Sequence, residues 1–107
     1  MNFVVIGRDK GDGSLRRRNR ADHLAFVEGR QAQIVYAGPL IDAGRMVGSL
    51  FVFDLPDRAA LDSYFAADPY FREAIFETVE IFESRRMVPE HEPGALRAEA
   101  CKAREAQ

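Results

Sequence analysis

The chain is poor in the side chains that most often reveal an enzyme: its 107 residues include one cysteine, two histidines and no tryptophan. One cysteine cannot form an internal disulfide, and so few histidine and cysteine ligands leave little material for a metal site. No apolar run reaches the ~18 residues of a membrane span, and the first residues lack the basic and apolar regions of a signal peptide. With 15 basic against 17 acidic residues, the basic excess that nucleic-acid binding rewards is missing. We therefore expect a cytoplasmic protein without metal, cofactor, membrane or nucleic-acid partner.

The rest of the sequence predicts four strands and two helices. Short β-branched and aromatic runs indicate strands, and apolar residues at helical spacing indicate helices. Asp57 precedes good helix formers and is placed to cap the second helix, as Ser14 or Asp12 is for the first. The second helix should end at Ala67, because Asp68 precedes a proline. The predicted strands cover residues 3–6, 34–37, 46–53 and 75–82, and the predicted helices cover residues 15–33 and 58–67.

This β-α-β-β-α-β order is typical of a ferredoxin-like α+β sandwich. We expect one domain over residues 1–88 and a C-terminal extension over residues 89–107, rich in alanine and charge, that is helical or disordered. The strand at 46–53 has apolar residues on both faces, with Phe51 and Phe53 on one and Leu50 and Val52 on the other. Because the helices cover only one face of the sheet, we expect a second subunit to cover the other, which predicts a homodimer.

The first helix carries the most informative polar pattern. Spacings of four, three, four and three place one histidine on a stripe with three arginines: Arg16, Arg20, His23, Val27 and Arg30. Such a histidine is a candidate general acid or base, and the arginines would attract an anionic substrate. The alternative is a solvated basic helix face with a neutral histidine packed against the sheet.

Two further polar residues are candidates, each with a structural alternative. Asp68 would orient His23, or it would only cap a helical turn that begins at Pro69. Ser49 would direct its hydroxyl into a cavity, or it would bond the local backbone. Its neighbour Gly48 would allow the close approach of another backbone or of a ligand.

Taken together, these segments resemble the YciI-like family, which has the YCII-related domain. The resemblance runs from about residue 2 to residue 87, and the extension lies outside it. It is carried by four short segments in the expected order: Ala21-Asp22-His23-Leu24, Ala37-Gly38-Pro39-Leu40, Gly48-Ser49 and Asp68-Pro69-Tyr70.

The resemblance implies a dimeric α/β-barrel protein in which His23 and Asp68 face each other in a pocket, with Ser49 nearby. A relative acts as a dehydrochlorinase on a chlorinated hydroxyquinol, without metal or organic cofactor. We therefore expect a lyase- or isomerase-type enzyme for a small anionic metabolite, in which His23 moves a proton and Asp68 orients it. Ser49, Arg20 and Tyr70 would bind the substrate, and Phe51, Tyr64 and Tyr70 would form walls.

Two alternatives to an enzyme stay open. The same pocket would serve a non-catalytic ligand-binding or regulatory dimer, and the extension would serve as the contact segment of an interaction protein. Fold resemblance does not choose among these, because one scaffold hosts many functions.

Overall fold

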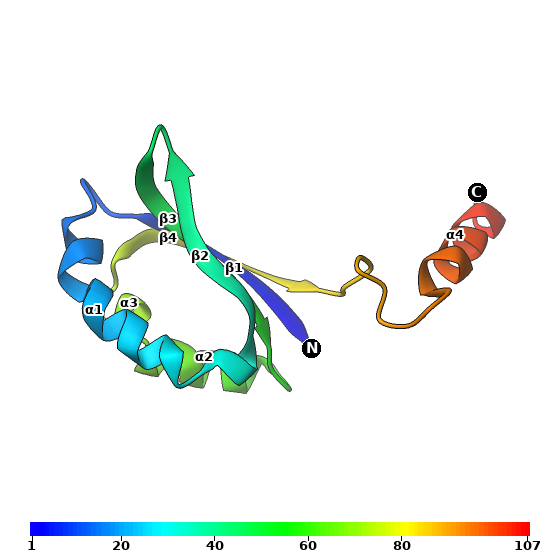
Figure 1. The fold of residues 1–107 in the computed structure, drawn as a ribbon, viewed down its shortest axis with the longest axis horizontal. Helices are drawn as coiled ribbons and strands as arrows, with labels where there is room; N and C mark the ends of the chain where they lie inside the picture. The colour runs from blue at the N-terminus through cyan, green and yellow to red at the C-terminus, as the bar shows by residue number, and fades with distance from the viewer.

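A computed structural model describes all residues from Met1 to Gln107. Four strands form one antiparallel sheet in the order β2-β3-β1-β4, and α1, α2 and α3 lie on one side of it (Figure 1). The α+β ferredoxin-like fold predicted from the sequence is thus confirmed. The strands are β1 (Asn2–Asp9), β2 (Ile34–Asp42), β3 (Arg45–Asp54) and β4 (Phe76–Ser84), and the helices are α1 (Ser14–Glu28), α2 (Arg58–Ala67), α3 (Pro69–Arg72) and α4 (Ala95–Glu105).

Strand register explains where the core lies. Phe3 is paired with Phe53 and Val5 with Phe51 across β1 and β3. All four side chains are buried, on the face that the helices cover. Leu61 and Tyr64 of α2 are buried in the same core. The apolar face that side-chain alternation gives each strand therefore packs against the apolar stripe that helical spacing gives α2.

The first helix differs from its prediction at both ends. It ends at Glu28 rather than Gln33, because the backbone N–H groups of Gly29 and Arg30 turn back to carbonyls three residues earlier and close the helix. Gly13, with φ of 84°, holds the N-cap position, and no side chain caps the helix. The carboxylate of Asp12 instead accepts from the Ser14 N–H at 3.0 Å, and this bond lowers the pKa of Asp12.

The second helix follows its prediction closely. The Asp57 carboxylate accepts from the Ala60 N–H at 2.9 Å and caps α2, which ends at Ala67. The short helix α3 begins directly after Asp68, with Pro69 in its first turn. The chain is therefore sharply bent at Asp68, and this bend decides where the Asp68 carboxylate lies.

The face of the sheet opposite α1–α3 is uncovered in the single chain and has an apolar centre, beside which Glu80 is paired with Ile6. Val4 is paired with Val52 and with Phe82, and Ile6 with Leu50, all on the face turned away from the core. Phe82 is exposed, and Val52 and Leu50 are half-buried.

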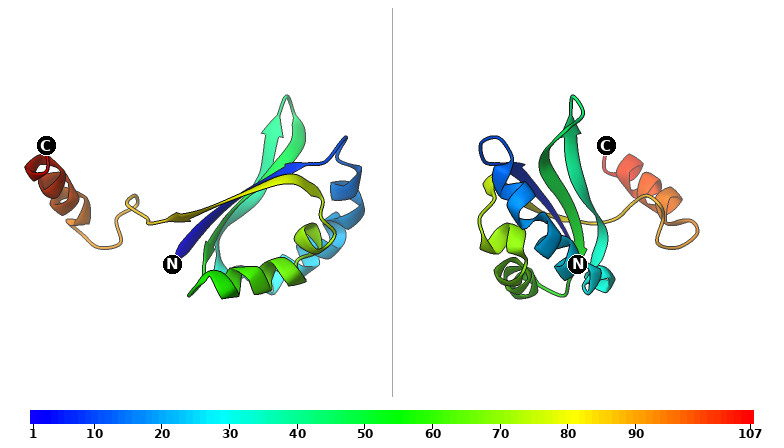
Figure 2. Two further views of the ribbon diagram at one scale, coloured as in Figure 1. Left: turned by 180° about the vertical axis from the view of Figure 1, so that it is seen from behind. Right: turned by 60° about the vertical axis from the view of Figure 1, so that its left-hand side comes forward.

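The C-terminal extension projects away from the sheet. Helix α4 lies far from the other helices, beyond a linker that follows β4 (Figures 1 and 2), and it has no buried residue. The chain is therefore elongated, with a longest dimension of 51 Å. None of the helices combines the length and the apolar character that crossing a membrane requires.

Candidate active site

A buried histidine–aspartate pair lies between the helices and the sheet. The Nδ1 atom of His23, from the middle of α1, is 2.8 Å from the Asp68 Oδ1 atom at the start of α3. Asp68 is fully buried and His23 is 8% exposed. Although 45 residues separate the two positions, the bend at Pro69 and the buried face of α1 bring them together.

Asp68 is held by two further donors. The Tyr70 N–H donates to Oδ1 at 2.9 Å, and the Tyr64 hydroxyl donates to Oδ2 at 2.7 Å. One carboxylate thus caps α3 and also contacts His23, so its geometry is compatible with both interpretations of Asp68 from the sequence. Burial, together with the Asp68 charge, raises the pKa of Tyr64 well above its usual range, so Tyr64 keeps its proton and remains a donor.

Aromatic rings fix the orientation of the His23 imidazole. The Tyr70 ring is stacked on it with a centroid distance of 3.6 Å and an interplanar angle of 5°. Phe51 presents an edge at 6.1 Å. Since Asp68 occupies Nδ1, the Nε2 atom is the ring nitrogen left for a ligand, and His23 lines a cavity.

A second buried ion pair, between Arg16 and Asp9, lies beside this cavity. The guanidinium of Arg16 donates through Nε and Nη2 to the Asp9 carboxylate at 2.7 and 2.9 Å. Its Nη2 also donates to the Ser49 hydroxyl oxygen at 2.8 Å, and the group lies over the Tyr70 ring at 5.0 Å. Ser49, which accepts from Arg16, retains its own hydrogen as a donor.

The sequence analysis placed Arg16 on the arginine stripe but not among the expected site residues, and it did not single out Asp9. Arg16 is 4% exposed and lies two helical turns before His23. Its place on the same stripe as His23 was the one sequence feature that could have predicted its place in the site. Asp9 lies outside the strand predicted over residues 3–6, although it is the last residue of β1, and nothing local to it marks a partner seven residues further on. The alternative of a fully solvated basic face is therefore wrong at Arg16, which is a buried member of the site.

The cavity has a volume of about 160 Å³ and lies between α1, β2 and β3. Four of the five predicted site residues line the cavity, namely Arg20, His23, Ser49 and Tyr70, and the fifth, Asp68, lies behind His23. Arg16 and Phe51 are also in the cavity wall. Arg20 is half-buried, and its Nη1 is 3.7 Å from the Met46 sulfur. Tyr64 was expected in the wall; it instead lies behind Asp68.

Tyr70 contributes an unusual feature to this cavity. It is 1% exposed, and its hydroxyl is a buried polar side-chain group without a hydrogen-bond partner. Because burying an unpaired hydroxyl costs about 1–3 kcal/mol, this group is a natural partner for a bound molecule. The cavity is thus lined by two residues, Ser49 and Tyr70, whose hydroxyl hydrogens no protein group accepts.

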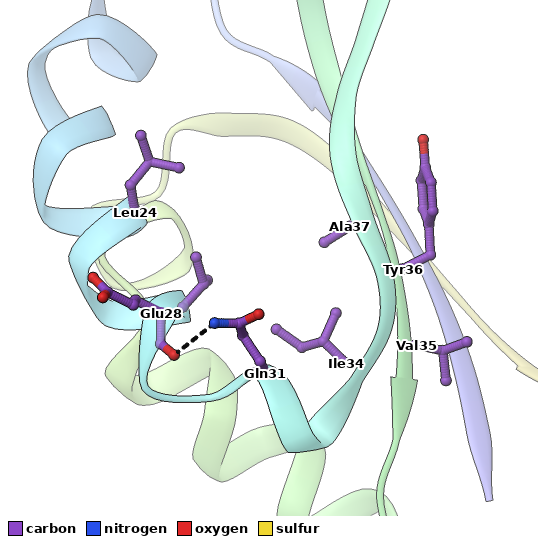
Figure 3. A pocket seen from close by; sticks show the side chains of 8 residues that line it. Leu24, Glu28, Gln31, Ile34, Val35, Tyr36 and Ala37 are labelled. Carbon is purple, nitrogen blue, oxygen red and sulfur yellow. Dashed lines mark hydrogen bonds between the residues drawn. The ribbon is translucent and has the colours of Figure 1, made fainter.

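A larger groove, of about 520 Å³, adjoins the cavity between α1 and β2. Leu24, Val27 and Ala37 belong to the walls of both hollows. In the groove, Ile34 and Ala37 point from β2 toward α1, while Val35 and Tyr36 point away (Figure 3). The cavity is therefore not enclosed, because it opens along α1 into this apolar groove.

The fold and the paired side chains define a class: a small ferredoxin-like α+β protein with a buried histidine–aspartate pair beside a cavity. A family model, the YCII-related domain, matches residues 1–85. The chain belongs to this family. No functionally curated protein matches it.

Solved structures agree with this assignment. The chain is similar to 5-chloro-2-hydroxyhydroquinone dehydrochlorinase (TftG) from Burkholderia phenoliruptrix AC1100, solved in complex with 2,5-dihydroxybenzoquinone. The TM-score is 0.72 at 26% identity, over 84% of this chain and 99% of that one. An antibiotic biosynthesis monooxygenase shares the fold alone, with a TM-score of 0.50 at 19% identity over 80% and 100% of the chains. A conserved protein from Methanosarcina mazei Go1 also shares the fold alone. Its TM-score is 0.51 at 10% identity, over 79% of this chain and 94% of that one.

Proposed function

We propose that this protein is an acid–base enzyme of the lyase or isomerase type that acts on a small acidic molecule, such as an enol or a polyhydroxylated ring. The observation that carries the proposal is the buried His23–Asp68 pair beside a cavity that Ser49, Tyr70 and two arginines also line. The chemistry proposed consists of proton transfers, which one histidine can supply without a cofactor.

His23 is the proposed proton carrier. Its Nδ1–H donates to Asp68, so Nε2 of the neutral ring bears the lone pair that accepts a proton from the substrate. Once protonated, the imidazolium is paired with the buried Asp68 carboxylate at 2.8 Å, a favourable interaction away from water. Stacking on Tyr70 keeps the ring in place, so the proton is taken and returned at one position.

The hydroxyl donors in the cavity wall would hold the oxygen on which negative charge develops. Ser49 and Tyr70 each have a hydroxyl hydrogen that no protein group accepts, and Arg16 supplies positive charge behind Ser49. Such preorganised donors stabilise an enolate or phenolate more than the neutral ground state. Arg20, in the cavity wall, would attract the anion as it enters.

The similarity to TftG suggests the reaction to test. A chlorinated hydroxyquinol can lose HCl when a proton from one hydroxyl moves to the ring carbon that bears chlorine, giving the keto form. Loss of chloride from that carbon and of a second hydroxyl proton then leaves a hydroxybenzoquinone, with no oxidant needed. His23 would accept the first proton and deliver it to carbon, so a single base serves both transfers.

The test uses the full chain with 5-chloro-2-hydroxyhydroquinone, and it follows chloride release and quinone absorbance. We expect turnover, and a loss of roughly 10²–10⁴-fold in kcat for His23→Gln and for Asp68→Asn. Arg18→Gln, an exposed change on the same helix, is the control and should leave the rate unchanged. Turnover at the wild-type rate in His23→Gln would refute the acid–base role.

A non-catalytic ligand-binding or regulatory protein is the second candidate. It is favoured by the buried Tyr70 hydroxyl without a partner, which calls for a ligand but not for a reaction. Binding of 2,5-dihydroxybenzoquinone without turnover of any chlorinated or enolic analogue would select this candidate. The cytosolic location predicted from the sequence stays a prediction.

We further propose that the protein is a homodimer joined through the open face of the sheet. Val4, Val52, Leu50 and Phe82 would then be buried between two sheets rather than facing water. This proposal rests on the burial requirement, since contiguous exposed apolar surface on a soluble protein marks an interaction site.

A further inference from the structure

The groove between α1 and β2 has no role in the chemistry proposed above. We infer that it is a binding subsite for an apolar substituent, so that the substrate is an amphipathic molecule with an acidic ring and a hydrocarbon side chain. This inference rests on the proposed function, because it places the ring in the His23 cavity.

Continuity of the two hollows is the first observation. Leu24, Val27 and Ala37 line both the His23 cavity and the groove, so a substituent on a ring beside His23 would enter the groove without crossing a polar barrier. Leu24, in the wall that both hollows share, is 47% exposed. A hydrocarbon chain along this wall would cover it and remove its surface from water.

Volume is the second observation. The His23 cavity, at about 160 Å³, is smaller than the roughly 300–1,000 Å³ of typical sites for small organic ligands. The groove, at about 520 Å³, falls within that range. A single ring would therefore use only the smaller of two connected spaces and leave the larger one empty.

The distribution of charge sets the orientation of the ligand. Arg16 and Arg20 are at the cavity end, whereas the groove ends at Glu28 and Gln31. The Gln31 side-chain amide donates one N–H to the Glu28 carbonyl oxygen at 3.2 Å, and the Glu28 carboxylate lies on the outside of the helix (Figure 3). Anionic groups are thus favoured at the arginine end and neutral apolar groups at the other.

The test compares two probes by titration calorimetry with the full chain: 2,5-dihydroxybenzoquinone and its 3-hexyl derivative. Each methylene fully removed from water strengthens binding about fourfold, and the groove is partly open. We therefore expect the hexyl compound to bind at least tenfold more tightly. Gln31→Trp, which fills the groove from an exposed position, should remove this gain and leave the binding of the parent compound unchanged. Ala32→Trp, on the same turn but outside the groove, is the matched control and should keep the gain.

The two proposals fail differently. Absence of binding by both probes would count against the ring site itself, and thus against the proposed function. Equal affinities for the two probes, or a gain that survives Gln31→Trp, would overturn the groove inference alone. A gain seen only after deletion of residues 89–107 would assign the groove to the extension of a second copy and would also overturn it.

Discussion

At the scale of single residues, the site depends on groups that serve several partners. Asp68 accepts from a helix backbone, from Tyr64 and from His23, and Arg16 divides its donors between Asp9 and Ser49. Such buried networks hold side chains in one arrangement only when every member is satisfied. Tyr64 matters here although it does not line the cavity, because its hydroxyl holds the Asp68 oxygen that His23 leaves free.

The first stability prediction concerns this hydroxyl. Tyr64→Phe removes a hydrogen bond to a buried carboxylate and should lower the free energy of unfolding at pH 7 by about 1.5–3 kcal/mol. Because the pKa of Tyr64 is raised in the folded protein, the folded protein keeps the Tyr64 proton at pH values at which the unfolded chain loses it. This contribution is therefore complete below about pH 10 and declines above it, so wild type and variant should converge as the pH rises beyond 10.

Urea unfolding at pH 7 and at pH 11 measures both effects. Tyr36→Phe is the control, since the Tyr36 side chain is exposed; it should change the free energy of unfolding by less than about 0.5 kcal/mol. A difference between Tyr64→Phe and wild type that stays constant from pH 7 to pH 11 would contradict the assignment.

At the scale of elements, two glycines set the spacing between strands beneath the site. A Cβ on Gly48 of β3 would overlap the Gly7 carbonyl oxygen of β1, and one on Gly7 would lie 2.6 Å from the Phe76 ring. The interpretation that Gly48 allows the close approach of another backbone is therefore confirmed. This contact determines the position of Ser49, the next residue, against Arg16.

The matching prediction is that Gly48→Ala lowers the free energy of unfolding by about 1–3 kcal/mol, because backbone must move to admit the methyl group. Gly29→Ala is the control, since Gly29 has φ of −82° and its nearest contact is 3.7 Å away; it should be neutral or slightly stabilising. Chemical denaturation of both variants measures the difference. Equal stability of the two would show that the strands are not closely packed at this point.

At the scale of the whole molecule, one sheet face is covered by three helices and the other is open. A sheet apolar on both faces needs two covers, and α4 lies too far from the sheet to supply the second (Figure 2). A second copy offers an apolar face of the same shape, in a symmetric arrangement that is the commonest among oligomers.

Val52→Lys, in the middle of the open face, tests the dimer. Wild type should sediment at low micromolar concentration as a species of twice 12.0 kDa, and Val52→Lys as a monomer, because a buried unpaired lysine is costly. Arg18→Glu, on the exposed side of α1, should stay dimeric. Wild type that sediments as a monomer would end this proposal.

Much of the fold was predictable because it depends on local signals. Alternating strands, the Asp57 cap and the break before Pro69 act over a few residues, and the predicted order matched the structure. The end of α1 was placed five residues late, because Gly29 and Arg30 close the helix through backbone bonds that no side-chain pattern marks. The candidate site was predictable in part, through the position of His23 on the arginine stripe.

The sequence by itself determined the order of elements, the two-faced apolar sheet and the family, because each follows from residue types and their spacing along the chain. The pairing of Asp68 with His23 across 45 residues was implied by the family resemblance, but its 2.8 Å geometry comes from the tertiary structure. Only the tertiary structure decided that Arg16 is buried against Asp9 and that the cavity opens into an apolar groove. The reason is physical. These contacts join side chains from distant elements, and their distances depend on how helices pack on the sheet rather than on any local propensity.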